Sequence, residues 1–154
     1  MDEQEYHSTY KNINPIRCVF EKAINSRTCN CSKATRFNLA DREGVSCQSE
    51  AAQQWCSNVL YTLREKARFA IQQKMIDGQL PHNAEIRIQN GSIKGLVKIL
   101  CGEESAESDL DENDIYALLQ SARAKYKNVE NFPYSELMQQ ISAYKTRRAR
   151  QRKK

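Results

Sequence analysis

Apolar residues recur at helical spacing in several separate stretches of the chain, and the clearest stretch covers residues 49 to 75. Polar side chains occupy the opposite side of the same helical projection, which is the pattern of a helix with one face in a core. Ser49 is a suitable N-cap, and Glu50 lies in the first turn, where the helix dipole favours an acid. We expect a long amphipathic helix here, ended by Asp77-Gly78. Its apolar face carries Ala52, Trp55, Cys56, Val59, Leu60, Leu63, Ala67, Ala70 and Ile71.

Two more amphipathic stretches lie near the C-terminus. Residues 114 to 126 carry apolar side chains at i, i+3, i+4, i+7 and i+11, with Asn113 as the expected cap. A second stretch begins at Ser135 and repeats the helical spacing. Two helices joined by a short loop form a helical hairpin, so we expect one within residues 114–154. The two apolar faces carry Ile115, Leu118, Leu119, Ala122 and Tyr126, then Leu137, Met138, Ile141 and Tyr144.

The pattern in the remaining stretches is shorter. Residues 1–14 are polar, and we expect them to be frayed or draped over the rest of the protein. Residues 16–24, behind Pro15, follow helical spacing, and Ser32 is a suitable cap for a second short helix that stops near Gly44. Residues 85–88 alternate as a short strand would, Asn90-Gly91 is a typical turn, and Ser92 is a suitable cap for a helix up to residue 100.

These elements predict a mostly α fold. The chain has 154 residues, enough for a core, and its few Gly (5) and Pro (3) residues agree with helices. We divide it into a Cys-rich helical domain (1–101), an acidic linker (102–113) and a helical hairpin with a basic C-terminal tail (114–154).

The net charge of +5 comes from that tail, because the rest of the chain has 17 basic and 19 acidic residues. Such a tail is suited to nucleic-acid phosphates, with salt-dependent affinity, or to an acidic partner surface, although many basic tails are simply solvated. The basic residues are Lys145, Arg147, Arg148, Arg150, Arg152, Lys153 and Lys154.

The interpretation of the cysteines depends on the cellular compartment in which the protein is found. No stretch reaches 18 consecutive apolar residues, so no membrane span is expected, and the polar, acidic N-terminus lacks the features of a secretory signal. We therefore expect a cytoplasmic protein, in which thiols stay reduced. Cysteines in such a protein indicate metal binding, redox chemistry or plain packing rather than structural disulfides.

Five of the six cysteines fall within residues 18 to 56. Thiolates are soft ligands for zinc, copper(I) and iron–sulfur clusters, and four of them complete either a structural zinc site or a cluster. The absence of Cys-x-x-Cys argues against the common zinc knuckles, and the surplus cysteine favours an iron–sulfur cluster. Zinc, or no metal at all, are the alternatives. The candidate ligands are Cys18, Cys29, Cys31, Cys47 and Cys56.

The five candidates differ in the support they have. Cys29 and Cys31 flank one residue of an expected turn, which makes them the strongest pair. Cys18 lies opposite the apolar face of its expected helix, as a ligand would. Cys47 precedes the N-terminus of the long helix, where backbone N–H groups lower a thiol pKa. Cys56 lies on an apolar face, so packing explains it equally well.

Three residues outside that set are also relevant. We expect Cys101 to be a packed thiol and His82 to be a solvated loop residue rather than a ligand. Lys33 belongs to a group of basic residues around the cysteines, completed by Arg27, Arg36 and Arg42, which could offset the charge of a cluster and are otherwise ordinary solvated side chains.

Known catalytic motifs are absent from the sequence. It has no Gly-rich phosphate loop, no Gly-x-Ser-x-Gly and no His-Glu-x-x-His, so we expect no independent catalytic activity. The preferred hypothesis is a small metal-binding accessory, electron-transfer or sensing protein that acts with a protein partner. The alternatives are a nucleic-acid-binding regulator with a structural metal centre, and a metal-free helical adaptor.

Overall fold

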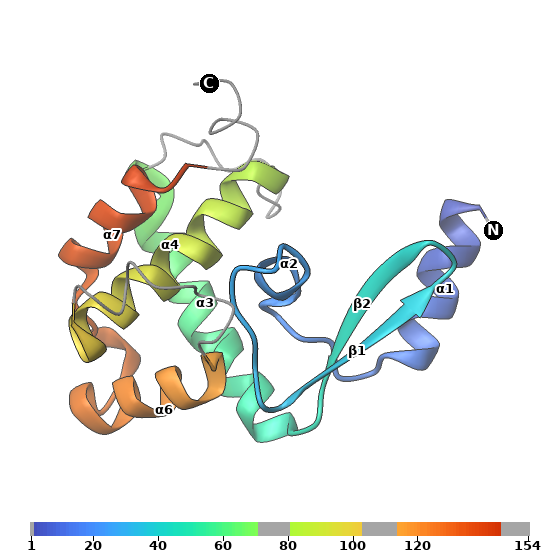
Figure 1. Ribbon diagram of the computed structural model, residues 1–154, viewed down its shortest axis with the longest axis horizontal. Helices are drawn as coiled ribbons and strands as arrows, with labels where there is room; N and C mark the ends of the chain where they lie inside the picture. Colours follow the sequence, from blue (N-terminus) through green and yellow to red (C-terminus); the bar gives the residue numbers. More distant parts are fainter. Residues whose placement is uncertain (1, 71–80, 103–113, 146–154) are drawn as a thin grey trace.

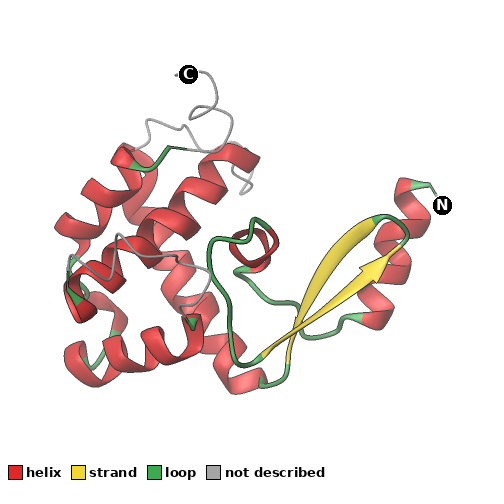
Figure 2. Ribbon diagram, in the orientation of Figure 1, coloured by secondary structure: helices red, strands yellow, loops and turns green. Residues whose placement is uncertain are grey.

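The computed structural model describes residues 2–70, 81–102 and 114–145, and this part of the chain is mostly helical, as predicted (Figures 1 and 2). Its six α-helices are accompanied by one short 3-10 helix and one β-hairpin. In chain order the elements are α1 (Glu3–Ile13), α2 (Glu21–Asn25), β1 (Ala34–Leu39), β2 (Arg42–Cys47), α3 (Glu50–Ala70), α4 (His82–Cys101), α6 (Ile115–Tyr126), η2 (Val129–Asn131) and α7 (Tyr134–Ala143).

Some predictions lie outside the described residues. These are the end of the long helix at Asp77-Gly78, the acidic linker from residue 103 onward, and the basic tail beyond Lys145. They stay predictions.

The helical body consists of α3, α4, α6 and α7, and it lies apart from the hairpin and α1 in Figure 1. The long helix α3 and the two C-terminal helices, α6 and α7, are confirmed as helices. Ser49 caps α3 by accepting a hydrogen bond from Ala52 N at 3.2 Å. The pair is joined through η2, and α7 packs on α4 and α3. The core of the body contains the fully buried Leu60, Leu63, Ile88, Ile93, Leu96, Leu119, Leu137 and Ile141.

Helices α4 and α7 approach each other closely because α4 has glycines at 91 and 95, one turn apart on one face. A Cβ atom on Gly91 would lie 2.7 Å from Ile141 Cα, and one on Gly95 would lie 2.9 Å from Leu137 Cδ2. The predicted strand at 85–88, the turn at Asn90-Gly91 and the cap at Ser92 are therefore wrong, because all of these residues lie inside α4. Packing against α7, and not a turn, accounts for Gly91.

The first 25 residues also differ from expectation. Residues 2–14 are not frayed, since Asp2 caps α1 by accepting a hydrogen bond from Glu5 N at 2.7 Å. The helix predicted over 16–24 is reduced to α2, because residues 16–18 pair with the edge of β2. Cys47 N donates to Ile16 O at 2.8 Å, and Cys18 N donates to Val45 O at 3.0 Å.

The helix predicted after Ser32 is wrong, and the segment forms the antiparallel hairpin β1–β2 instead. Phe37 lies opposite Gly44, and its ring fills the place that a Cβ on Gly44 would occupy. Such cross-strand pairs stabilise sheets. The ring of Tyr10 on α1 lies 5.7 Å from that of Phe37, so α1 covers the hairpin.

Buried polar groups hold the N-terminal part in place. Glu21 accepts hydrogen bonds from Tyr10 Oη, from Arg17 Nη2 at 2.8 Å and from Val45 N at 2.8 Å. A buried carboxylate is tolerated when it is paired in this way. From the helical body, the side chain of Gln89 accepts from Ala23 N at 3.0 Å and donates to Val19 O at 3.2 Å.

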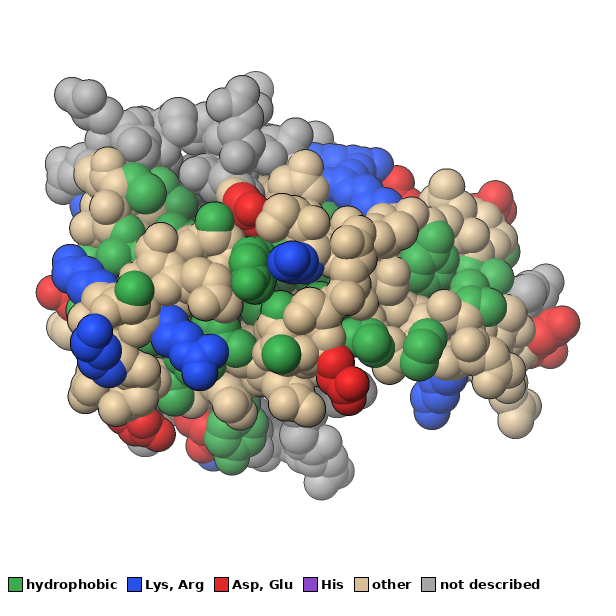
Figure 3. All heavy atoms as spheres, turned by 90° about the horizontal axis from the view of Figure 1, so that it is seen from below, with side chains coloured by type: hydrophobic (Ala, Val, Ile, Leu, Met, Phe, Trp, Pro, Cys, Tyr) green, Lys and Arg blue, Asp and Glu red, His purple; other side chains and the backbone are tan. Residues whose placement is uncertain are grey.

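Figure 3 shows the molecule from below, with the helical body and the hairpin side in one view. Lys and Arg side chains stand over the helical body at its left. Hydrophobic side chains reach the surface between the body and the hairpin. No described helix is long and apolar enough to cross a membrane.

Candidate metal centre

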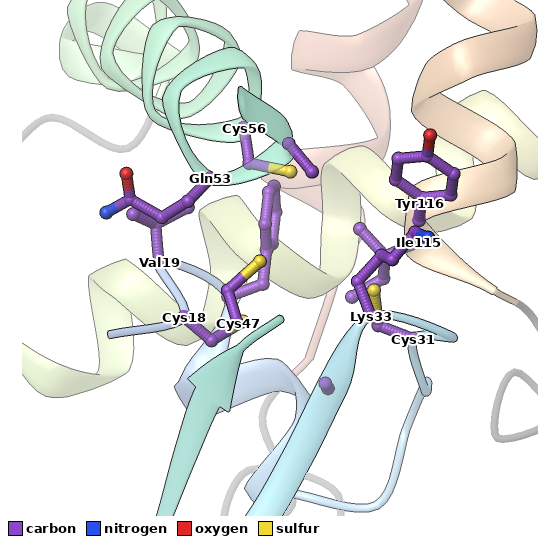
Figure 4. A pocket seen from close by; sticks show the side chains of 12 residues that line it. Cys18, Val19, Cys31, Lys33, Cys47, Gln53, Cys56, Ile115 and Tyr116 are labelled. Carbon is purple, nitrogen blue, oxygen red and sulfur yellow. The ribbon is translucent and has the colours of Figure 1, made fainter. Parts of the chain in front are cut away.

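Four of the five predicted ligands line a single pocket, shown in Figure 4. They come from four separate segments. Cys18 precedes α2, Cys31 precedes β1, Cys47 ends β2, and Cys56 lies on α3. The cavity measures about 20 Å³, which is room for roughly one water molecule.

The four cysteines stand on different sides of this space. In Figure 4, Cys56 on α3 lies above it, Cys18 and Cys47 lie together on one side, and Cys31 lies across from them. The rest of the wall is mainly apolar. It is completed by Val19, Phe20, Ala34, Ala52, Ile115 and Tyr116, with Lys33 and Gln53 as the polar members.

Strand pairing explains why the first three cysteines meet. Ala34 is the register partner of Cys47, so the loop that ends at β1, with Cys31 in it, lies beside the end of β2. The edge pairing of residues 16–18 with β2 brings Cys18 to the same end of the hairpin. The fourth cysteine is supplied by α3, which starts directly after β2. On that helix Ala52 and Cys56 are four residues apart and therefore share the face toward the pocket.

Burial and the neighbouring thiols raise the pKa of three cysteines of the pocket, Cys18, Cys31 and Cys56. Burial raises the pKa of Cys18 to about 12, assisted by Cys31 and Cys47, while a backbone hydrogen bond from Phe20 acts against this. The pKa of Cys56 is also raised to about 12, by burial first and then by the other three cysteines. Deprotonating such a group of thiols requires a compensating positive charge inside the pocket.

Cys31 has the most polar surroundings of the four. Burial raises its pKa, whereas backbone hydrogen bonds from Lys33 and Tyr116 lower it. These two N–H groups stabilise a thiolate more than a thiol. The Nζ atom of Lys33 lies 5.1 Å from the centre of the Tyr116 ring. The thiol of Cys47 donates a hydrogen bond to Ser49 O at 3.1 Å.

Cys29 does not join the pocket. Its side chain is 1% exposed and packs in the core. Cys31, two residues away in the same loop, is half-buried and lines the pocket. The structure therefore divides the pair that sequence reasoning favoured most.

Three other expectations need correction. His82 is the first residue of α4 rather than part of a loop, and it does not line the pocket. Cys101 is exposed at the end of α4, not packed. Cys18 lies in extended backbone, so the helical projection that supported it does not apply, although the residue does reach the pocket.

Asp114 also belongs to this region, although it is not among the predicted site residues. It caps α6 in place of the predicted Asn113, and its Oδ1 atom accepts hydrogen bonds from Tyr116 N at 3.0 Å and from Ser32 N at 2.9 Å. The second bond reaches the loop that carries Cys31. Its position just before an amphipathic helix was a signal for the cap, but nothing in the sequence linked it to Ser32.

Within residues 2–70, 81–102 and 114–145, no three His, Cys, Asp or Glu side chains are arranged so that they could hold one metal ion as they stand. No family model, curated protein or solved structure matches this chain.

Proposed function

We propose that this protein binds an iron–sulfur cluster through Cys18, Cys31, Cys47 and Cys56, and that it acts in the cytoplasm as an accessory electron-transfer or sensing protein with a protein partner. One observation carries the proposal. Four of the six cysteines come from four different segments and line one pocket whose remaining wall is mainly apolar. Four thiolates are the ligand set of the common [2Fe–2S] and [4Fe–4S] clusters.

The electrostatics of the pocket support a ligand role over simple packing. A cysteine that serves only as a small apolar side chain gains nothing from three further thiols beside it. Here the neighbouring thiols raise the pKa of Cys18 and of Cys56, because negative charges on these sulfurs would repel one another. A cationic centre turns this repulsion into attraction, and binding then releases protons. The N–H groups that favour the thiolate of Cys31 act in the same direction.

The thiols face one another across the pocket. Cys31 lies opposite Cys18 and Cys47, and Cys56 lies above the same space (Figure 4). A cluster, which places iron and sulfide between its four thiolate ligands, suits this arrangement.

A structural zinc site is the second candidate, because the cavity is small. About 20 Å³ suits one ion, whereas a cluster requires the segments that carry Cys31 and Cys47 to move apart. The two candidates therefore differ in how far the loops shift on loading, and metal analysis distinguishes them directly.

The test is metal content after anaerobic purification and reconstitution with iron and sulfide. We expect a brown protein with a visible absorption band and with iron and sulfide in stoichiometric amounts. Colourless protein with stoichiometric zinc would establish the second candidate instead.

The chain offers a matched control for this test. Cys31→Ala should lose the centre, whereas Cys29→Ala, two residues away in the same loop, should keep it, as should Cys101→Ala at the exposed end of α4. A wild-type protein that binds neither metal, or a Cys31→Ala variant that binds as much as wild type, would overturn the proposal.

A further inference from the structure

The loop that carries Cys31 is attached to the start of α6 on both sides of the cysteine. On one side, Ile115 N donates a hydrogen bond to Asn30 O at 2.9 Å. On the other, Ser32 N donates to Asp114 Oδ1, also at 2.9 Å. Cys31 is therefore held between two hydrogen bonds to consecutive residues of another element.

The carboxylate of Asp114 is ionised at neutral pH. Burial opposes ionisation, but hydrogen bonds from Ser32, Ala117 and Tyr116 outweigh it and lower the pKa of Asp114. The negative charge also affects the neighbouring sulfur, because Asp114 raises the pKa of Cys31. One side chain thus combines a positional role with a permanent charge next to the pocket.

We propose that Asp114 is a positioning residue that fixes Cys31 toward the pocket and, through its negative charge, lowers the reduction potential of the cluster. This inference rests on the proposed iron–sulfur function. Reduction adds an electron to the cluster, and a nearby anion makes that addition less favourable. Hydrogen bonds to the ligand sulfurs and local charge are two of the factors that set such potentials. Lys33, on the pocket wall, is the opposing charge.

Two substitutions of Asp114 distinguish its role in positioning the Cys31 loop from the effect of its negative charge. Asp114→Asn retains the oxygen that accepts from Ser32 N and Tyr116 N, and Asn caps helices as well as Asp does. We expect this variant to carry as much cluster as wild type, with the equilibrium between oxidised and reduced cluster shifted about tenfold toward the reduced form, or about 59 mV for one electron. Asp114→Ala loses the acceptor as well, so it should also lose its cluster faster to a chelator.

Glu136→Gln is the control variant. Glu136 is likewise an acid at the start of a helix, in the first turn of α7, and it does not line the pocket. Its substitution should leave the potential unchanged. Redox titration followed by visible absorption, with iron and sulfide measured on each sample, provides both readouts.

Each result has a distinct consequence. A wild-type protein that takes up no cluster overturns the proposed function and this inference together. A loaded wild type with an Asp114→Asn variant of unchanged potential overturns the inference alone. An equal shift in Glu136→Gln would show a general charge effect and would also overturn it.

Discussion

Raising the pH from about 8 to about 10 should destabilise the metal-free protein through two pocket thiols. The pKa of Cys18 and of Cys56 is about 12 in the folded protein, because both are buried beside other thiols, against an ordinary value of 9.0. Above pH 9 the unfolded chain therefore gives up these protons first and binds fewer of them than the folded chain. The free energy of unfolding falls wherever the unfolded state binds fewer protons, which here means between pH 9 and 12.

The size of the loss follows from the two pKa values. With 9.0 unfolded and about 12 folded, each thiol removes about 1.4 kcal/mol at pH 10, or about 3 kcal/mol for the pair. Domains are commonly stable by only about 5–15 kcal/mol, so the effect is readily measured. Below pH 8 it vanishes, because both states are then protonated at these sites.

The assay is urea unfolding followed by circular dichroism, in the presence of a reductant and a chelator, at both pH values. The control is the double variant Cys18→Ala/Cys56→Ala. It has its own packing defect, but that defect is the same at each pH. The raised pKa values of Tyr10 and Tyr134 also act in both proteins and cancel.

Wild type should lose about 3 kcal/mol more than the double variant between the two pH values. If both proteins lose the same amount, Cys18 and Cys56 are not buried, protonated thiols in the metal-free state. Burial beside the other thiols would then not describe Cys18 and Cys56, whatever metal the pocket binds.

Two further predictions concern the helical body. Gly91→Ala should lower the free energy of unfolding by about 1–3 kcal/mol, because its Cβ would meet the Ile141 backbone at 2.7 Å. The Cβ atom of Gly95→Ala would meet mainly movable side-chain atoms, so this variant should lose less free energy of unfolding. Urea unfolding of both variants measures the difference. Equal losses would contradict the close packing of α4 on α7. Glu85→Ala should cost about 1–3 kcal/mol, since the buried carboxylate accepts from Arg64 and Gln89. The measurement is thermal unfolding of Glu85→Ala and of Glu65→Ala, a control that loses only a half-buried pair with Arg68, and similar melting temperatures of the two variants would refute the prediction.

The sequence predicts the helices whose burial is one-sided. Helices α3, α6 and α7 each place apolar residues on one face and begin next to a residue suited to capping or to the first turn, so local pattern and tertiary packing agree. Helix α4 violates this rule because it buries polar residues, among them Gln89 and Asn90. Their partners lie far away in the chain: Ala23 and Val19 for Gln89, and Thr28 for Asn90. No local pattern reveals such partners, and the helix was therefore read as a strand and a turn.

The hairpin was missed for a related reason. The sequence of residues 34–47 has no residue pair typical of a two-residue hairpin turn. The turn lies between Leu39 and Arg42, which pair with each other, and Ala40 takes the left-handed conformation there, with φ of 55°. The pairing of Phe37 with Gly44 and the cover provided by Tyr10 stabilise the strands. Both are contacts between separate segments, and a helical reading of the same residues satisfies local spacing equally well.

The sequence predicts that several cysteines share one site, but it does not predict which of them line the pocket. Clustering along the chain indicated that several cysteines between residues 18 and 56 share a role. Which four meet depends on strand register and on one loop, and these place Cys31 in the pocket and Cys29 in the core. Cys56, which packing explained equally well, lines the pocket because the α3 face that carries it also carries Ala52 toward the hairpin.

The segments around the pocket are already joined without a metal. Gln89 holds the backbone at Val19, the next residue to Cys18; β2 pairs with the backbone of Cys18 itself; and Asp114 holds the loop of Cys31. A centre bound by the four thiols would therefore add to an existing framework, unlike the small zinc domains that are unfolded without their metal. The metal-free protein should consequently fold, and that is the condition under which the alkaline titration of Cys18 and Cys56 can be measured.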